Sequence, residues 1–377
     1  MKIGIDCRLW SETGVGRYIR NLVLNLQRID SKNTYILFVL SKDRDEILKQ
    51  VEDTRRNIQD DTFKIIEVDI RWHSIKEQLR FASILSYENL DLMHFPYISV
   101  PLNYQKPFVV TIHDLIPYYY PTSKASTLPA PIYFLKLLAY KYILKQAVNN
   151  AKKIISVSNT TKDEIVRQFR VESEKIVVTY EGVDSQISNI KNQKPKINGK
   201  YFLYVGNAFP HKNLDSLLEA FKIFSKEWEE AQLIFVGKED CFYKRLKEKV
   251  RKLKLNEKIV FMENIDDGKL SALYKNAVAT IMPSFMEGFG LPALEAMANK
   301  CLVLASNIPS LKEVCSDSAI YFDPNNIDDI LNKMKLAYVG NVKQNSVNIE
   351  RGVEIANSFS WEKMAKETLS VYESALS

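Results

Sequence analysis

The chain has 377 residues, of which 46% are hydrophobic and 26% are charged, and its formal net charge is +6. This length exceeds the size at which a single hydrophobic core usually stops growing, so two domains are expected. The net charge is too small for a dedicated nucleic-acid binder. A membrane span is not predicted either, because the sequence lacks the run of about 18 apolar residues that one needs. The four cysteines show no paired spacing, which favours free thiols and a cytoplasmic location; they are Cys7, Cys241, Cys301 and Cys315.

Apolar runs alternate with helical patterns along the chain, which is typical of parallel sheets covered by helices on both faces. In the first half the predicted strands are residues 2–6, 35–40, 63–68, 91–95, 107–112, 153–157 and 176–179. Residues 185–200 are rich in Ser, Asn and Lys without periodicity, which predicts a linker. Beyond it the predicted strands are residues 201–206, 232–237, 258–262, 278–282 and 301–305, and a helix closes the chain. We therefore expect an α/β protein with two doubly wound, Rossmann-like domains, 1–184 and 201–359, and a ligand cleft at the carboxyl ends of their strands.

A glycine pair, Gly14 and Gly16, follows the first predicted strand and precedes a helix that also contains Arg17. A dinucleotide-binding fingerprint would need a third glycine at position 19, where this chain has Ile19. The sequence thus disfavours a dehydrogenase. A phosphate-binding loop and a simple strand-to-helix turn both fit the pattern.

Of the four histidines, His94 lies at the end of a predicted strand and His113 directly follows another. His94 has apolar neighbours, so we interpret it as a hydrogen-bonded structural residue. His113 is followed by Asp114, and a carboxylate commonly orients an imidazole ring. We therefore expect His113 at the ligand cleft with Asp114 as its partner.

The most informative stretch is PSFMEGFGLPALEAMA at residues 283–298, where a predicted strand leads through a loop into a helix. Pro292 suits the first helical turn because its missing N–H has no helical partner there. The backbone N–H groups that then lie at the positive end of the helix dipole, where an anion is favoured, are those of Phe289, Gly290 and Leu291. Glu287 and Glu295 can face the same bound group. A nucleotide-sugar suits this arrangement, because it carries phosphates, hydroxyls and, during reaction, developing positive charge.

These motifs resemble, in order and spacing, those of retaining glycosyltransferases with the GT-B fold, in particular family 4 (glycosyl transferases group 1). Glu287 and Glu295, with seven intervening residues, match the E-x7-E signature of that family, and the landmarks span nearly all of the chain. The resemblance implies GT-B architecture, with two domains facing a central cleft and a final helix, residues 360–377, that crosses back to the first domain. The Gly-Arg-Tyr and Pro-His-Lys-Asn variants are most similar to mannosyltransferases of bacterial surface polysaccharides, such as the lipopolysaccharide O-antigen.

The resemblance also implies roles for individual residues. Glu287 would face the sugar, His113 would contact hydroxyls of the donor sugar, and Lys212 would stabilise the departing diphosphate. Asn207 stands where the family often has an arginine, and His211 is a candidate substitute. The donor-binding residues implied are Gly14, Gly16, Arg17, Asn207, Lys212, Gly288, Phe289, Gly290, Leu291 and Glu295. Neither a metal nor a cofactor is implied, since no Asp-x-Asp or histidine cluster in the sequence suggests a divalent-metal site.

Residues 115–162 contain seven lysines and no acidic residue, interleaved with tyrosines. Within a predicted helix at 131–149, the basic residues are Lys136, Lys141 and Lys145. Such a helix suits an anionic membrane or a lipid-linked acceptor, and an ordinary lysine-rich solvent face is the alternative. We expect peripheral contact at the inner face of the cell membrane.

The expected reaction is transfer of a hexose, with mannose from GDP-mannose as the best candidate, to a hydroxyl of a lipid-linked glycan, with retention of configuration and without metal. Three other functions stay open at this point. They are a nucleotide-sugar 2-epimerase, a starch- or glycogen-synthase-like enzyme, and a non-catalytic nucleotide-sugar-binding subunit.

Overall fold

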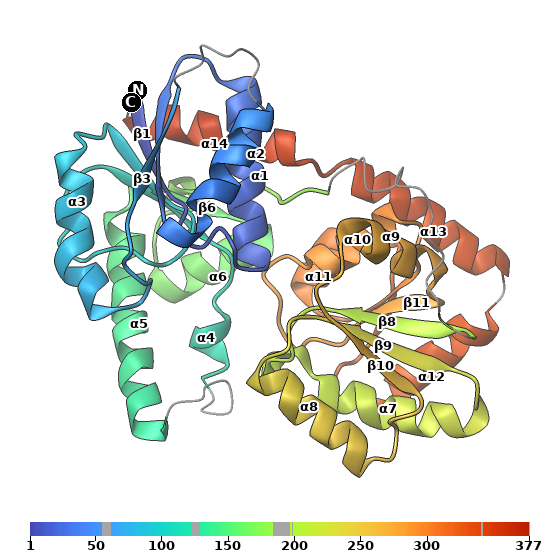
Figure 1. Ribbon diagram of the computed structural model, residues 1–377. Coiled ribbons are helices and arrows are strands. Elements are labelled where there is room, and N and C mark those ends of the chain that lie inside the picture. The colour runs from blue at the N-terminus through green and yellow to red at the C-terminus, as the bar shows by residue number, and fades with distance from the viewer. Residues whose placement is uncertain (55–61, 122–128, 184–196, 198, 341, 377) are drawn as a thin grey trace. The chain divides into compact units, whose positions relative to one another are not determined.

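The computed structural model describes residues 1–54, 62–121, 129–183, 197, 199–340 and 342–376, which form two compact units (Figure 1). The first unit comprises Met1–Tyr118, Pro131–Gly182 and Ser360–Ser377, and the second comprises Tyr119–Ala130 and Val183–Phe359. Most of the predicted linker, 185–200, lies outside the described residues.

The first unit is built on a seven-stranded sheet with the order β3-β2-β1-β4-β5-β6-β7, in which every pairing is parallel. Its strands are β1 (Lys2–Asp6), β2 (Thr34–Val39), β3 (Phe63–Glu67), β4 (Leu92–Phe95), β5 (Phe108–Ile112), β6 (Lys153–Ser156) and β7 (Ile176–Val178). The direction of winding reverses between β1 and β4, so the loops after these strands flank a topological switch point, where such folds bind ligands.

Helices cover both faces of this sheet (Figure 1). The helices in this part of the chain are α1 (Gly14–Ile29), α2 (Arg44–Thr54), α3 (Ala82–Tyr87), α4 (Ile116–Tyr119), α5 (Ala130–Asn150), α6 (Asn159–Phe169) and α14 (Trp361–Leu376), with a π-helical turn at Glu77–Phe81. The last helix, α14, packs on α1 and contacts β5 and β6. The C-terminal helix therefore belongs to the first unit, as the GT-B resemblance implies.

The chain leaves the first unit at Gly182 and returns to it at Ser360. A Cβ atom at Gly182 would lie 2.2 Å from the backbone nitrogen of Trp361. Glycine is therefore required here, because only its bare Cα allows the outgoing and returning segments to touch.

His94 is fully buried in the core of the first unit. Its Nδ1 lies 2.6 Å from the hydroxyl of Tyr372 on α14, and its Nε2 lies 2.8 Å from Oγ1 of Thr111 on β5. The interpretation of His94 as a structural residue is confirmed. Burial, assisted by the nearby His113, lowers the pKa of His94 to about 3.

The stability of the first unit is expected to fall as the solution becomes acidic. In the unfolded chain the imidazole of His94 takes up a proton below about pH 6.5, whereas the folded protein keeps it neutral. The unfolded state then binds more protons, so lowering the pH from 7.5 to 5.0 should cost about 2 kcal/mol through this group. Urea unfolding at both pH values measures this loss. The variant His94→Gln should lose that part of the pH dependence, and an unchanged dependence would refute the assignment.

The second unit contains a six-stranded parallel sheet with the order β10-β9-β8-β11-β12-β13. Its strands are β8 (Tyr201–Val205), β9 (Gln232–Val236), β10 (Ile259–Met262), β11 (Ala279–Met282), β12 (Val303–Ser306) and β13 (Ile320–Phe322). Its helices are α7 (Leu214–Glu227), α8 (Cys241–Lys252), α9 (Asp267–Asn276), α10 (Leu291–Ala298), α11 (Pro309–Cys315), α12 (Ile327–Val339) and α13 (Val342–Asn357). Here the switch point lies between β8 and β11, and the loops after these two strands flank it.

Candidate active site

Two loops meet at the switch point of the second unit, and each carries a residue expected to be catalytic. A 3₁₀ turn, Pro210–Lys212, follows β8, and the loop after β11 contains Glu287. The Lys212 ammonium donates to both carboxylate oxygens of Glu287, at 2.7 and 2.8 Å. Glu287 is only 7% exposed. The structure thus brings the expected diphosphate ligand and the expected sugar-facing carboxylate into one ion pair.

Ser284, which is fully buried, completes the surroundings of Glu287. Its hydroxyl donates to Oε1 of Glu287 at 2.6 Å. Burial acts to raise the pKa of Glu287, but the charge of Lys212 and the hydrogen bonds from Lys212 and Ser284 together hold that pKa below its usual value. Glu287 is therefore ionised at neutral pH. Ser284 was not predicted as a site residue, although its position three residues before Glu287 could have indicated it.

Helix α10 begins as the sequence predicts, with Leu291 first and Pro292 in the first turn. Gly290, at the N-cap, has φ +106°, and a Cβ there would lie 2.7 Å from a methyl carbon of Leu311. Glycine therefore allows the close loop that leads into the helix. The ring of Phe289 packs edge-on against Phe359, with centroids 5.7 Å apart, so what Phe289 can offer a ligand is its backbone.

Glu295 lies one turn into α10 and is 6% exposed. One of its carboxylate oxygens accepts a hydrogen bond from the hydroxyl of Tyr274 on α9, at 3.0 Å. Tyr274 is almost fully buried and was not identified from the sequence. It fixes the orientation of the carboxylate that we expect to meet the ribose.

His211 and Asn207 are the candidates for a second phosphate ligand, but neither carries a positive charge at neutral pH. Burial and the charge of Lys212 lower the pKa of His211 to about 4, so at neutral pH it is uncharged. The backbone oxygen of Asn207 accepts from the hydroxyl of Tyr204 at 2.5 Å, and its side-chain oxygen accepts from the N–H of Phe209 at 3.3 Å. Neither residue takes the place of an arginine charge in this loop; the cation that the loop brings to Glu287 is Lys212.

His113 lies at the carboxyl end of β5 in the first unit, and the expectation that Asp114 orients its ring is wrong. Nδ1 of His113 lies 3.2 Å from Oε1 of Glu181, and its Nε2 donates to the backbone oxygen of Pro96 at 2.9 Å. The carboxylate of Asp114 instead accepts a hydrogen bond from the N–H of Ile116, two residues further along the chain, at 2.8 Å, as Asp commonly does in tight turns. Glu181 follows β7, far away in sequence, which is why no local pattern revealed it.

The two glycines after β1 have different surroundings. A Cβ at Gly16 would lie 2.5 Å from the backbone oxygen of Trp10, so Gly16 is needed for packing. Gly14 begins α1 and has open space where a side chain would be. Arg17 lies in the same first turn of α1. The turn therefore combines a structural glycine with an open helix N-terminus that can accept an anion.

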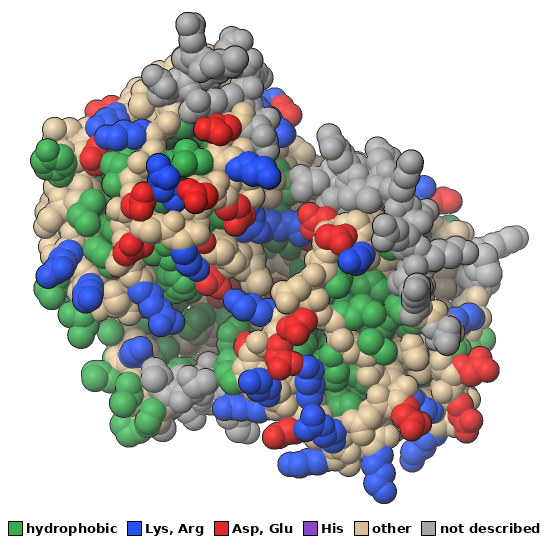
Figure 2. Space-filling model, in the orientation of Figure 1, with side chains coloured by type: hydrophobic (Ala, Val, Ile, Leu, Met, Phe, Trp, Pro, Cys, Tyr) green, Lys and Arg blue, Asp and Glu red, His purple; other side chains and the backbone are tan. Residues whose placement is uncertain are grey.

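Helix α5 places large apolar side chains in solvent, and Figure 2 shows hydrophobic groups gathered over its end. The exposed ones are Ile132, Phe134, Leu135, Leu138 and Tyr142. Lys136 and Lys145 are exposed beside them, whereas the Lys141 ammonium lies 4.2 Å from the ring centre of Tyr118. This surface therefore mixes exposed apolar and basic side chains. None of the helices that the structure describes is long and apolar enough to cross a membrane.

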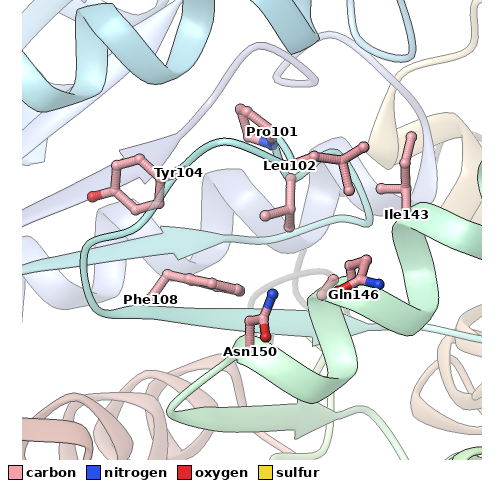
Figure 3. A pocket seen from close by; sticks show the side chains of 9 residues that line it. Pro101, Leu102, Tyr104, Phe108, Ile143, Gln146 and Asn150 are labelled. Carbon is pink, nitrogen blue, oxygen red and sulfur yellow. The ribbon is translucent and has the colours of Figure 1, made fainter.

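A shallow pocket lies elsewhere in the first unit (Figure 3). Leu102, Phe108, Ile143 and Asn150 are among its lining residues. Because Phe108 begins β5, the pocket lies at the amino end of that strand, opposite to the edge where such sheets bind ligands. Among the described residues, no group of three or more His, Cys, Asp or Glu side chains is arranged to hold a metal ion.

The chain is similar to known proteins over nearly its whole length. The family described as Glycosyltransferase Family 4 matches residues 13–187, and Glycosyl transferases group 1 matches residues 186–350. The O-antigen chain mannosyltransferase RfbU of Salmonella typhimurium is 31% identical over 315 residues, covering 83% of this chain and 84% of that protein. The O-antigen chain mannosyltransferase B of Escherichia coli is 26% identical over 386 residues, covering 96% of both.

Solved structures show the same fold. WaaG, a glycosyltransferase involved in lipopolysaccharide biosynthesis, aligns with a TM-score of 0.71 at 14% identity, covering 98% of this chain and 99% of WaaG. Anabaena HepE in complex with UDP-glucose aligns with a TM-score of 0.75 at 15% identity, covering 99% of this chain and all of that chain.

Proposed function

We propose a specific reaction for this chain, which belongs to the family 4 glycosyltransferases (glycosyl transferases group 1) and has the GT-B fold: transfer of mannose from GDP-mannose to a hydroxyl of a lipid-linked glycan. The observation that carries the proposal is the ion pair between Lys212 and Glu287, next to the N-terminus of α10. The names of the relatives, which are O-antigen chain mannosyltransferases, support mannose as the sugar.

In this proposal the donor diphosphate binds Lys212 and the backbone N–H groups at the start of α10. Both are positive, and they stabilise the charge that develops on the phosphate as the bond from the sugar C1 to the phosphate oxygen breaks. The ionised Glu287 faces the sugar and stabilises its developing positive charge. Glu295, oriented by Tyr274, accepts the ribose hydroxyls.

We propose that configuration is retained by front-face substitution. The acceptor oxygen forms its bond to C1 on the face from which the diphosphate departs, and the acceptor proton passes to the leaving phosphate oxygen. The chain then supplies no separate general base. Within the first unit, Gly14, Gly16, Arg17 and His113 are proposed as ligand-binding residues, the first three for phosphate.

Calorimetric titration with GDP, UDP, ADP and CMP in EDTA tests the donor site. GDP is expected to bind more tightly than the others, because GDP-mannose is the proposed donor. Its binding should need no metal, because Lys212 and the helix dipole supply the positive charge. Binding of none of the four, or binding only after a divalent metal is added, would refute the metal-free donor site.

We further propose that α5 docks on an anionic membrane, with Lys136 and Lys145 at the headgroups and the exposed Leu135 and Leu138 at the acyl boundary. Each basic residue near such a surface contributes about 1 kcal/mol. Reversing both charges, with Lys136→Glu and Lys145→Glu, should therefore weaken binding to phosphatidylglycerol vesicles, measured by sedimentation, by about thirtyfold or more.

The matched control reverses two exposed lysines of the second unit, Lys226→Glu and Lys252→Glu, and so makes the same change in net charge. If α5 is the docking surface, only the α5 variant loses vesicle binding. Equal losses in the two variants would indicate a general charge effect instead.

A further inference from the structure

Asn213 directly follows Lys212 and has a backbone conformation that few residues adopt. Its φ and ψ are 55° and 35°, in the left-handed region, and it is only 4% exposed. Glycine adopts this conformation most easily, and asparagine is among the few other residues that tolerate it. A buried asparagine at such a position has a side chain that must find partners, since burial without hydrogen bonds is costly.

The side-chain amide of Asn213 has two acceptors. Nδ2 donates to the backbone oxygen of Pro283 at 3.0 Å and to that of Pro324 at 2.8 Å. Pro283 follows β11 directly, and Pro324 lies in the loop after β13. A carbonyl oxygen can only accept, so the two contacts use both amide hydrogens. One side chain thereby joins the carboxyl ends of three strands.

Asn213 lies between the two loops that carry the proposed catalytic residues. Lys212 precedes it, and the loop that starts at Pro283 carries Glu287. A second link between the same loops is the backbone hydrogen bond from the N–H of Phe285 to the oxygen of His211, at 2.8 Å. The third link is the ion pair itself, which a bound diphosphate would have to share or displace. Neither the amide contacts of Asn213 nor the backbone bond uses Lys212 Nζ or the Glu287 carboxylate, so a ligand could displace the ion pair without breaking them.

We propose that Asn213 is a positioning residue, whose amide holds the loop after β11 against the loop after β8 so that Lys212 and Glu287 act on one donor molecule. Asn213 acts through these two residues and does not contact the substrate. This role rests on the proposed function and extends it to the asparagine of the Pro-His-Lys-Asn motif, to which the resemblance gives no role of its own.

The variant Asn213→Gly tests the side chain without changing the backbone, because glycine adopts the left-handed conformation and lacks only the amide side chain. A displacement of about 1 Å in a catalytic group can cost roughly a hundredfold in rate, and we expect a loss of that size in sugar transfer. We expect GDP to bind about tenfold more weakly, since Lys212 is less well placed. The control is Asn89→Gly, at an exposed left-handed position of the first unit with φ 48°, which should change neither quantity.

A double-mutant cycle distinguishes positioning from a general structural role. If Asn213 acts through Lys212, adding Asn213→Gly to Lys212→Gln should weaken GDP binding no further. The same loss in both backgrounds would overturn the proposal, as would wild-type behaviour of Asn213→Gly. Wild-type protein that binds no nucleoside diphosphate would instead overturn the proposed function, and the role of Asn213 with it.

The variant Asn213→Asp keeps the proposal testable if the glycine variant does not fold. Its ionised carboxylate would face two carbonyl oxygens, so GDP binding should be weak at neutral pH and should recover toward pH 5, where a protonated carboxyl can donate one hydrogen bond. Wild-type affinity at neutral pH, or no recovery on acidification, would contradict the positioning role.

Discussion

Replacing Glu287 by glutamine is expected to reduce sugar transfer by about a thousandfold while GDP affinity stays unchanged or rises. The carboxylate is ionised and nearly buried, so its charge acts strongly on a sugar that becomes positive in the transition state. In the free protein the same charge neutralises Lys212, and its removal leaves the ammonium fully available to a diphosphate. Transfer is measured by product formation and affinity by calorimetry.

Glu257→Gln is the control for this experiment, because Glu257 is an exposed glutamate of the same unit. It should behave as wild type in both assays. Normal turnover of Glu287→Gln would remove Glu287 from the reaction. A parallel loss of GDP affinity would place it on the nucleotide instead of the sugar.

Replacing Lys212 by glutamine should affect both binding and chemistry. Its ammonium is proposed to contact the diphosphate before and during bond cleavage, and we expect GDP affinity to fall by about tenfold and turnover by about a thousandfold. The acid limb of the pH profile should also move to higher pH. Without Lys212, burial acts with less opposition on Glu287, so the pKa of this carboxyl rises and the required carboxylate is lost at a higher pH.

The conservative variant Lys212→Arg keeps a positive charge beside Glu287 and should leave the acid limb close to that of wild type. A GDP affinity of Lys212→Gln equal to that of wild type would contradict the role of Lys212 at the diphosphate. An acid limb that does not move would contradict the electrostatic coupling of Lys212 to Glu287.

The sequence predicted the features that depend on local patterns. The strand at residues 107–112 was evident because Phe108, Val109 and Val110 form an apolar run, and β5 occupies Phe108–Ile112. The start of α10 was evident from Gly290 and Pro292, whose backbone requirements are specific. The three-residue strand β13 (Ile320–Phe322) was not predicted, because so short a run is common outside strands.

The residues that hold the candidate site in place could not be predicted in this way. Glu181 reaches His113 because β7, β6 and β5 lie side by side, and Tyr274 reaches Glu295 because α9 neighbours α10. The contacts of Asn213 depend on the order of β8, β11 and β13 in the sheet. Each of these contacts follows from the topology, which a single sequence does not display. The error over Asp114 has the same origin, since its nearness in sequence to His113 was mistaken for nearness in space.

The return of the chain from Gly182 to Ser360 has a consequence for biosynthesis. Most of the first unit is synthesised before the second unit, but it needs α14, which is synthesised after the second unit. Until then, the face of α1 that packs on α14 has no cover, and His94 lacks the hydroxyl of Tyr372. The second unit, in contrast, is complete before α14 emerges. Nascent chains therefore carry an exposed apolar surface until α14 emerges, so a premature stop shortly before Ser360 leaves the first unit unfinished and dependent on chaperones.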